Sequence, residues 1–157
     1  MTHRPRRSIE EITDRTDRII GAPTEALAAS APALADELLA MGEDVLDAWL
    51  IGKGQTPTAE LSEGFRLLAQ HRQAARGNPS FNACRETCRE LVYHHNLIRL
   101  SPTGEDAPRN IRLGAMVLRH LALFVEGKLV ADGLGDFCCS SRPIRQGEQA
   151  ELKTEAL

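Results

Sequence analysis

The chain has 157 residues, of which 42% are hydrophobic and 26% charged, with a formal net charge of −3. This composition is typical of a soluble globular domain, and with no run of about 18 apolar residues it excludes a membrane-spanning helix. Aromatic residues make up only 4% of the chain, which favours a helical protein packed with aliphatic side chains.

The N-terminal residues are basic and have no apolar segment after them, which argues against a secretory signal. We therefore expect a cytoplasmic protein whose four cysteines are reduced. Residues 1–7 are predicted to be a disordered basic tail, residues 8–145 a single helical domain, and residues 146–157 a flexible tail.

Helix signals recur along the whole domain. Ser8 and Glu11 have the spacing of a capping box and predict a first helix that ends near Ile20. Further helices are predicted over about 32–52, 58–76, 80–100 and 109–132, separated by Gly- and Pro-containing segments and by a short turn at 24–30. The sequence thus predicts an all-α, up-and-down bundle of about five helices with flexible termini.

The predicted helix 80–100 carries two cysteines and two histidines. At 100° per residue, one stripe of this helix holds the side chains expected to face the core. These are Phe81, Cys84, Cys88, Leu91, Val92, His95 and Ile98. A second apolar set lies on the opposite side and consists of Tyr93, Leu97 and Leu100.

A metal or iron–sulfur site is one interpretation of the cysteine stripe, because side chains at i and i+4 can share an ion. The predicted ligands are Cys84, Cys88, His95, His120, Cys138 and Cys139, with His71 an alternative histidine. Cys84 and Cys88 lack the C-x-x-C spacing of common zinc sites, so burial as small apolar residues in the core is the competing interpretation.

Two further interpretations use the same residues. In a thiol switch, a disulfide within the helix is expected to constrain little, whereas a bond from Cys84 or Cys88 to Cys138 or Cys139 would fix the tail to the helix. Haem is the less favoured ligand: His95 or His120 would be axial, but the chain has few aromatic residues and no C-x-x-C-H motif.

Tyr93, Leu97 and Leu100 predict an interaction surface, either for a homodimer or for another protein partner. Acidic residues are concentrated in 10–63 and arginines in 66–145. This asymmetry is best explained by acidic helices packing on basic ones, and the spread of the arginines disfavours nucleic acid.

The sequence contains no Gly-rich phosphate loop, H-E-x-x-H motif or catalytic triad, so enzyme activity has no support. We expect a small cytoplasmic regulatory or accessory protein that binds a metal, an iron–sulfur cluster or haem through its Cys/His face. The alternatives are an oligomeric adaptor without a cofactor and a thiol-based redox switch.

Overall fold

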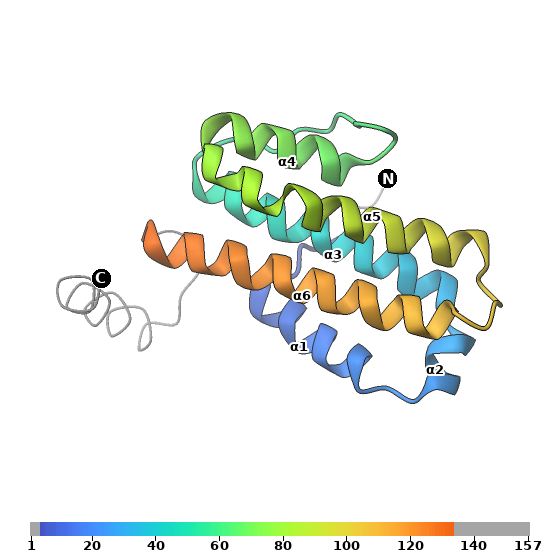
Figure 1. The fold of residues 1–157 in the computed structure, drawn as a ribbon. Helices are drawn as coiled ribbons and strands as arrows, with labels where there is room; N and C mark the ends of the chain where they lie inside the picture. The colour runs from blue at the N-terminus through green and yellow to red at the C-terminus, as the bar shows by residue number, and fades with distance from the viewer. Residues whose placement is uncertain (1–3, 134–157) are drawn as a thin grey trace.

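The computed structural model describes residues 4–133, and within them the secondary structure is helical, with a single isolated bridge between Ser62 and Phe65. The elements are α1 (Ile9–Ile20), α2 (Thr24–Ala29), α3 (Ala31–Gly52), α4 (Arg66–Gly77), the 3-10 helix η1 (Pro79–Cys84), α5 (Arg85–Leu100) and α6 (Ala107–Ala131) (Figure 1). The prediction of an all-α bundle is confirmed.

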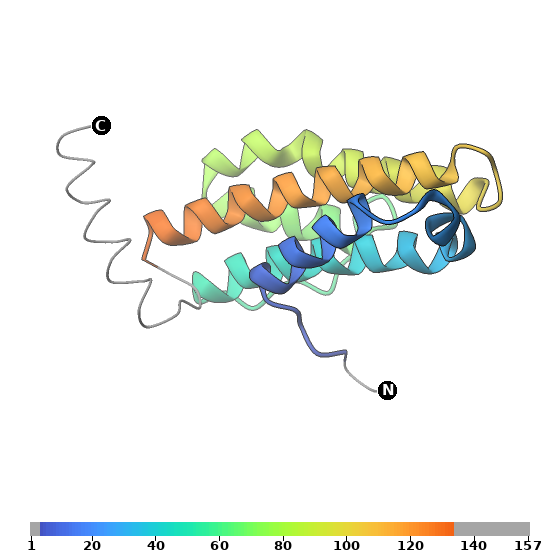
Figure 2. The ribbon, with the colours of Figure 1, turned by 90° about the horizontal axis from the view of Figure 1, so that it is seen from below.

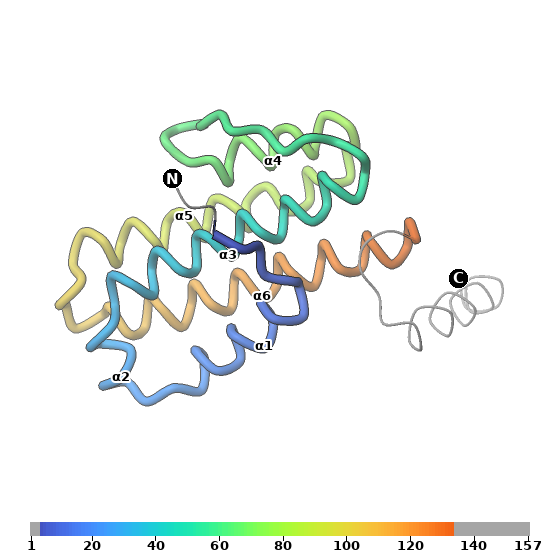
Figure 3. The backbone as a smooth tube through the Cα atoms, turned by 180° about the vertical axis from the view of Figure 1, so that it is seen from behind, coloured from blue at the N-terminus to red at the C-terminus, as the bar shows by residue number. Residues whose placement is uncertain are grey.

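Three long helices form the centre of the bundle. α3, α5 and α6 pack on one another along most of their lengths, and α5 runs in the opposite direction to the other two (Figures 1 and 3). α1 covers the side formed by α6 and α3, whereas α4 lies on α3 and α5 (Figure 2). The core is mostly aliphatic, as the composition predicts.

Several helix boundaries follow the predicted signals. Ser8 caps α1 by the expected capping box: its hydroxyl accepts from the Glu11 amide at 3.1 Å, and its own amide donates to the Glu11 carboxylate at 2.8 Å. Pro32 and Pro108 lie in the first turns of α3 and α6. Among the described residues, no helix has both the length and the apolar character that a membrane span requires.

Two predicted boundaries differ from the structure. The helix predicted from residue 58 begins at Arg66, because a tight turn closed by mutual backbone hydrogen bonds between Ser62 and Phe65 comes first. The helix predicted from Ser80 begins as η1, and the α-helical pattern starts at Arg85. Helix α6 is also partly open to solvent. Its apolar residues Met116 and Leu123 are 53% and 42% exposed.

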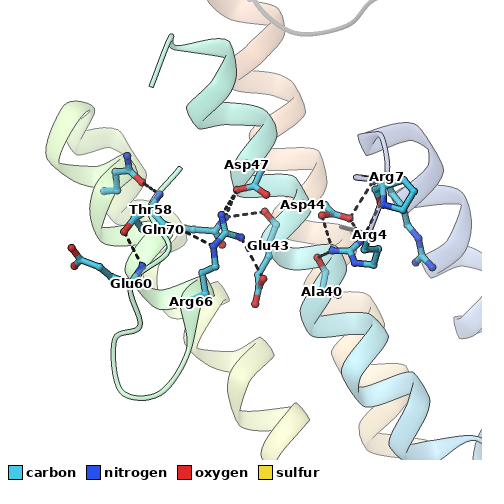
Figure 4. Close-up of polar contacts among 12 residues, drawn as sticks. Arg4, Arg7, Ala40, Glu43, Asp44, Asp47, Thr58, Glu60, Arg66 and Gln70 are labelled. Carbon is cyan, nitrogen blue, oxygen red and sulfur yellow. Dashed lines mark hydrogen bonds and ion pairs between the residues drawn. The ribbon is translucent and has the colours of Figure 1, made fainter. Parts of the chain in front are cut away.

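The acidic side of α3 is matched by arginines from elsewhere in the chain (Figure 4). Asp44 is 3% exposed and accepts hydrogen bonds from the Arg4 guanidinium at 2.7 and 2.8 Å and from the Arg7 amide at 3.2 Å. Arg66 of α4 reaches Asp47 at 2.9 Å. Part of the charge asymmetry therefore reflects ion pairs within the chain. Two of the arginines in the N-terminal segment take part, since Arg4 pairs with Asp44 and Arg7 pairs with Glu37.

Glycines set the closest approaches of the long helices. A Cβ atom on Gly42 of α3 would lie 2.7 Å from the Leu91 side chain of α5, and one on Gly114 of α6 would lie 3.2 Å from the Leu38 side chain of α3. Leu91 and Leu38 are themselves buried, so neither can move aside freely. These glycines allow the three helices to pack closely.

We predict opposite effects on stability for two Gly→Ala substitutions. Gly42→Ala should lower the free energy of unfolding by about 1–2 kcal/mol, because overpacking outweighs the gain in helix propensity. Gly127→Ala in α6, where no atom lies within 4 Å of the added Cβ, should instead raise it by up to about 1 kcal/mol. Urea denaturation measures both, and a stabilised Gly42→Ala variant would contradict the close packing of α3 on α5.

Candidate thiol site

The two described cysteines, Cys84 and Cys88, lie where η1 meets α5. Asn78 starts η1 because its side-chain oxygen accepts from the Ser80 amide at 3.2 Å and from the Ser80 hydroxyl at 2.6 Å. A 3-10 helix has three residues per turn, so Phe81 and Cys84 fall on the same side. The Cys84 thiol consequently donates to the Phe81 carbonyl at 3.3 Å.

Cys84 is the residue that immediately precedes α5. Its φ of −103° and ψ of 12° are not those of a regular α-helix, so Cys84 ends η1 and does not belong to the first turn of α5. Cys88 lies one turn further along, where its thiol is near enough to that of Cys84 for each to shift the pKa of the other. Both residues are buried, with 2% and 0% of their surfaces exposed.

His71 of α4 completes the group. Its Nε2 atom lies 2.7 Å from the Phe81 carbonyl oxygen, and because a carbonyl can only accept, Nε2 carries a proton. The ring is 5% exposed and lies near enough to the Cys84 thiol to lower the pKa of that thiol. One carbonyl group therefore holds together a histidine from α4 and a cysteine at the start of α5.

The electrostatics of the group separate the two thiols. The neighbouring Cys88 thiol is the main cause that lowers the pKa of Cys84 to about 6, with a further contribution from His71, although burial opposes the shift. The Cys84 thiol raises the pKa of Cys88 well above its usual range, and burial adds to this effect. Of the two thiols, Cys84 is therefore the one that ionises more readily.

His71 responds to the same negative charge. Burial lowers the pKa of the ring, but the Cys84 side chain and the hydrogen bond to the Phe81 carbonyl outweigh burial, and the pKa is raised. The group thus combines a thiol of lowered pKa, a second thiol one turn away, and a histidine of raised pKa. In chemical terms these are a nucleophile, a second thiol able to resolve an oxidised first one, and a proton donor.

Aromatic packing connects this group to the core. The Phe81 ring lies 4.7 Å from the Trp49 ring of α3, centroid to centroid, and 5.6 Å from the Phe124 ring of α6. Trp49 and Phe81 are almost fully buried. Any displacement of the Phe81 backbone will therefore be transmitted to Trp49, the only tryptophan in the chain.

The structure does not bring the predicted metal ligands together within residues 4–133, where no group of three or more His, Cys, Asp or Glu side chains is placed to hold an ion. His95 lies 3.1 Å from the Asp36 carboxylate through Nε2, and its ring packs edge-on against Phe65. His120 is exposed, as is Met116, so these two do not line an interior ligand site. Cys138 and Cys139 lie outside the described residues, and a metal site that includes them stays a prediction.

The predicted interaction surface is accessible. Tyr93 and Leu100 are 58% and 81% exposed, and Leu97 is half-buried. Burial inside the monomer, the competing explanation for this apolar set, does not apply to Tyr93 and Leu100. Their use by a second copy of the chain or by another protein stays a prediction.

The meeting of His71 with Cys84 at the Phe81 carbonyl is not predicted from the sequence, in which His71 is only an alternative metal ligand. The two residues belong to different helices, so that no local pattern relates them. The available signal was the Asn78–Pro79 pair, which can begin a 3-10 turn as well as end a helix.

Comparison with known proteins adds no relative from which the role of these side chains can be transferred. No protein-family model, no curated protein and no solved structure matches this chain.

Proposed function

We propose that this protein is a thiol-based redox switch in which Cys84 and Cys88 are oxidised to a disulfide. The observation that carries the proposal is the placement of two buried thiols one turn apart at the start of α5, with His71 bound to the same Phe81 carbonyl as Cys84. A purely structural pair of buried cysteines requires neither the histidine nor the shared carbonyl. The regulatory role expected from the sequence is thereby assigned to the thiols rather than to a bound metal.

The oxidant that fits the site is a small hydroperoxide, since Cys84 is only 2% exposed and a protein disulfide would not reach it. The Cys84 thiolate attacks the distal peroxide oxygen, the O–O bond breaks, and the departing hydroxide or alkoxide takes a proton, for which His71 is the nearest donor. Cys84 is then a sulfenic acid. The Cys88 sulfur attacks it, loses its proton and releases water, so that two thiols are oxidised and one peroxide is reduced.

Closure of this disulfide must alter the backbone. The Cβ atoms of residues one turn apart on a helix are about 5–6 Å apart, whereas a disulfide needs about 3.5–4.5 Å. Cys84 is the residue able to move, because it precedes the regular part of α5. A disulfide within one regular helix is expected to constrain little. The Cys84–Cys88 bond instead joins η1 to α5, and its closure draws Cys84 away from the Phe81 carbonyl.

The ionisation of Cys84 is the first test. The ultraviolet thiolate absorbance of the wild type minus that of Cys84→Ser should titrate with a midpoint near pH 6. Cys88→Ala should raise the midpoint most, and His71→Asn should raise it less, because Cys88 contributes most to the lowered pKa of Cys84 and His71 contributes less. Far-UV circular dichroism of each variant verifies the fold. A wild-type midpoint near the ordinary cysteine value of about 8.5 would contradict the proposed activation of Cys84.

A second test follows the disulfide through Trp49. In a variant with Cys138→Ser and Cys139→Ser, one equivalent of hydrogen peroxide should change the tryptophan fluorescence, and a dithiol reductant should restore it. The added Cys88→Ser substitution is the matched control: it should reduce the fluorescence change, because the sulfenic acid on Cys84, which a dithiol also reduces, cannot close the disulfide that draws Cys84 from the Phe81 carbonyl. If fluorescence is unchanged while both thiols are consumed, oxidation is not coupled to the Phe81–Trp49 contact.

A further inference from the structure

A groove between α4 and α5 is lined by four arginines among ten residues. It has a volume of about 540 Å³, and its charged lining residues besides His71 are Glu63, Arg72, Arg76, Arg85 and Arg89. Four guanidinium groups thus face a single carboxylate. Arg72 and Arg76 are one turn apart on α4, and Arg85 and Arg89 are one turn apart on α5, so two pairs of like charges meet across the groove.

This arrangement is electrostatically unfavourable on its own, since like charges one turn apart on a helix destabilise it by about 0.2–0.5 kcal/mol per pair. Within residues 4–133, neither Arg76 nor Arg85 has a carboxylate partner, and the Arg72 guanidinium bonds only to the Ser62 hydroxyl at 3.3 Å. Several arginines outside the groove are paired with carboxylates. Arg4, Arg15 and Arg66, for example, each form an ion pair with a carboxylate of α3.

Glu63 is the one acidic residue held in the groove, and its backbone is strained. It has a φ of 55°, in the left-handed region that disfavours residues other than glycine, and the following Gly64 has a φ of 86°. The turn places the Glu63 carboxylate against Arg89, whose two terminal nitrogens, Nη1 and Nη2, donate to the two carboxylate oxygens at 2.9 and 3.0 Å. Arg89 lowers the pKa of Glu63 most, and the charges of Arg85 and Arg72 add to this effect.

We propose that the arginine groove between α4 and α5 binds a small, multiply charged oxyanion, and that the Glu63 carboxylate occupies part of this site when the ligand is absent. The proposal does not rest on the thiol switch, because its ligands are the arginines and no cysteine takes part, although His71 lines both sites. The planar guanidinium fork recognises phosphate and carboxylate oxygens equally well, so both a phosphate compound and a polycarboxylate belong to the ligand class.

The ligand class is limited by size and charge. A groove of about 540 Å³ lies within the range of small-molecule sites, and its four arginines are confined to two short pairs rather than spread along a helix face. This compactness favours a small oxyanion over the extended backbone of a nucleic acid, whose footprint is a basic stripe. A monoanion is disfavoured, because it would leave most of the like charges unpaired.

The test is titration calorimetry of the reduced, full-length protein at low ionic strength with pyrophosphate, citrate and acetate. Pyrophosphate or citrate, or both, should bind at one site, and acetate should bind much more weakly. Arg76→Ala and Arg85→Ala should each weaken binding about tenfold, the effect of one charge-assisted hydrogen bond. Glu63→Gln should tighten binding about threefold, as expected when an exposed ion pair no longer competes.

Arg109→Ala is the matched control, since Arg109 is also exposed but lies at the start of α6, outside the groove. It should leave the affinity unchanged, and circular dichroism should show every variant folded. The proposal is overturned if neither pyrophosphate nor citrate binds, if Arg109→Ala weakens binding as much as Arg85→Ala does, or if only a nucleic acid binds. Preference between pyrophosphate and citrate identifies which oxyanion the groove selects.

Discussion

The position of Phe81 is the constraint on which the candidate site depends. Its ring packs between Trp49 of α3 and Phe124 of α6, and this fixes η1 against the centre of the bundle. Its carbonyl then accepts from His71 and from Cys84 on the opposite side of the backbone. One residue therefore connects the aliphatic and aromatic core with the only group of the described chain in which two thiols and a histidine interact.

The same connection explains why a small chemical change at Cys84 can have a structural effect. In the thiol form, Cys84 and His71 both donate to the Phe81 carbonyl. A Cys84 thiolate or disulfide has no S–H group, so that only His71 remains to donate to this carbonyl. In the proposed disulfide, Cys84 is in addition drawn toward Cys88. Because protein interiors are closely packed, these local changes displace neighbours rather than being absorbed by empty space.

The fold was predictable from sequence wherever local signals and hydrophobic periodicity agree. Ser8 with Glu11, Pro32 and Pro108 mark helix starts that the structure reproduces. The start of α5 was not predictable in this way: Ser80 follows Asn78–Pro79 and resembles an N-cap, but the Asn78 side chain caps a 3-10 turn instead. Because the α-helix starts at Arg85 and not at Ser80, Cys84 lies at the boundary between η1 and α5 and not in an inner turn of α5.

The candidate site was predictable only in part. Periodicity identifies Cys84 and Cys88 as buried neighbours, and both are. It also groups them with His95, which instead contacts Asp36 nearer the surface. His71 and the groove arginines belong to two helices, and their meeting depends on how α4 packs on α5, which no local pattern encodes. The expected pairing of acidic and basic helices holds for Arg66 with Asp47, but not for Arg76 and Arg85.

Peptide mapping of the oxidised protein tests the switch most directly. Trypsin cleaves after Arg85 and therefore separates Cys84 from Cys88, so only a disulfide keeps their two peptides together. After treatment of the full chain with one equivalent of hydrogen peroxide, mass spectrometry should find these two peptides joined, with the loss of two hydrogen atoms, and separated again by reduction. Unlinked peptides, or Cys84 and Cys88 each joined to Cys138 or Cys139 instead, would contradict the account.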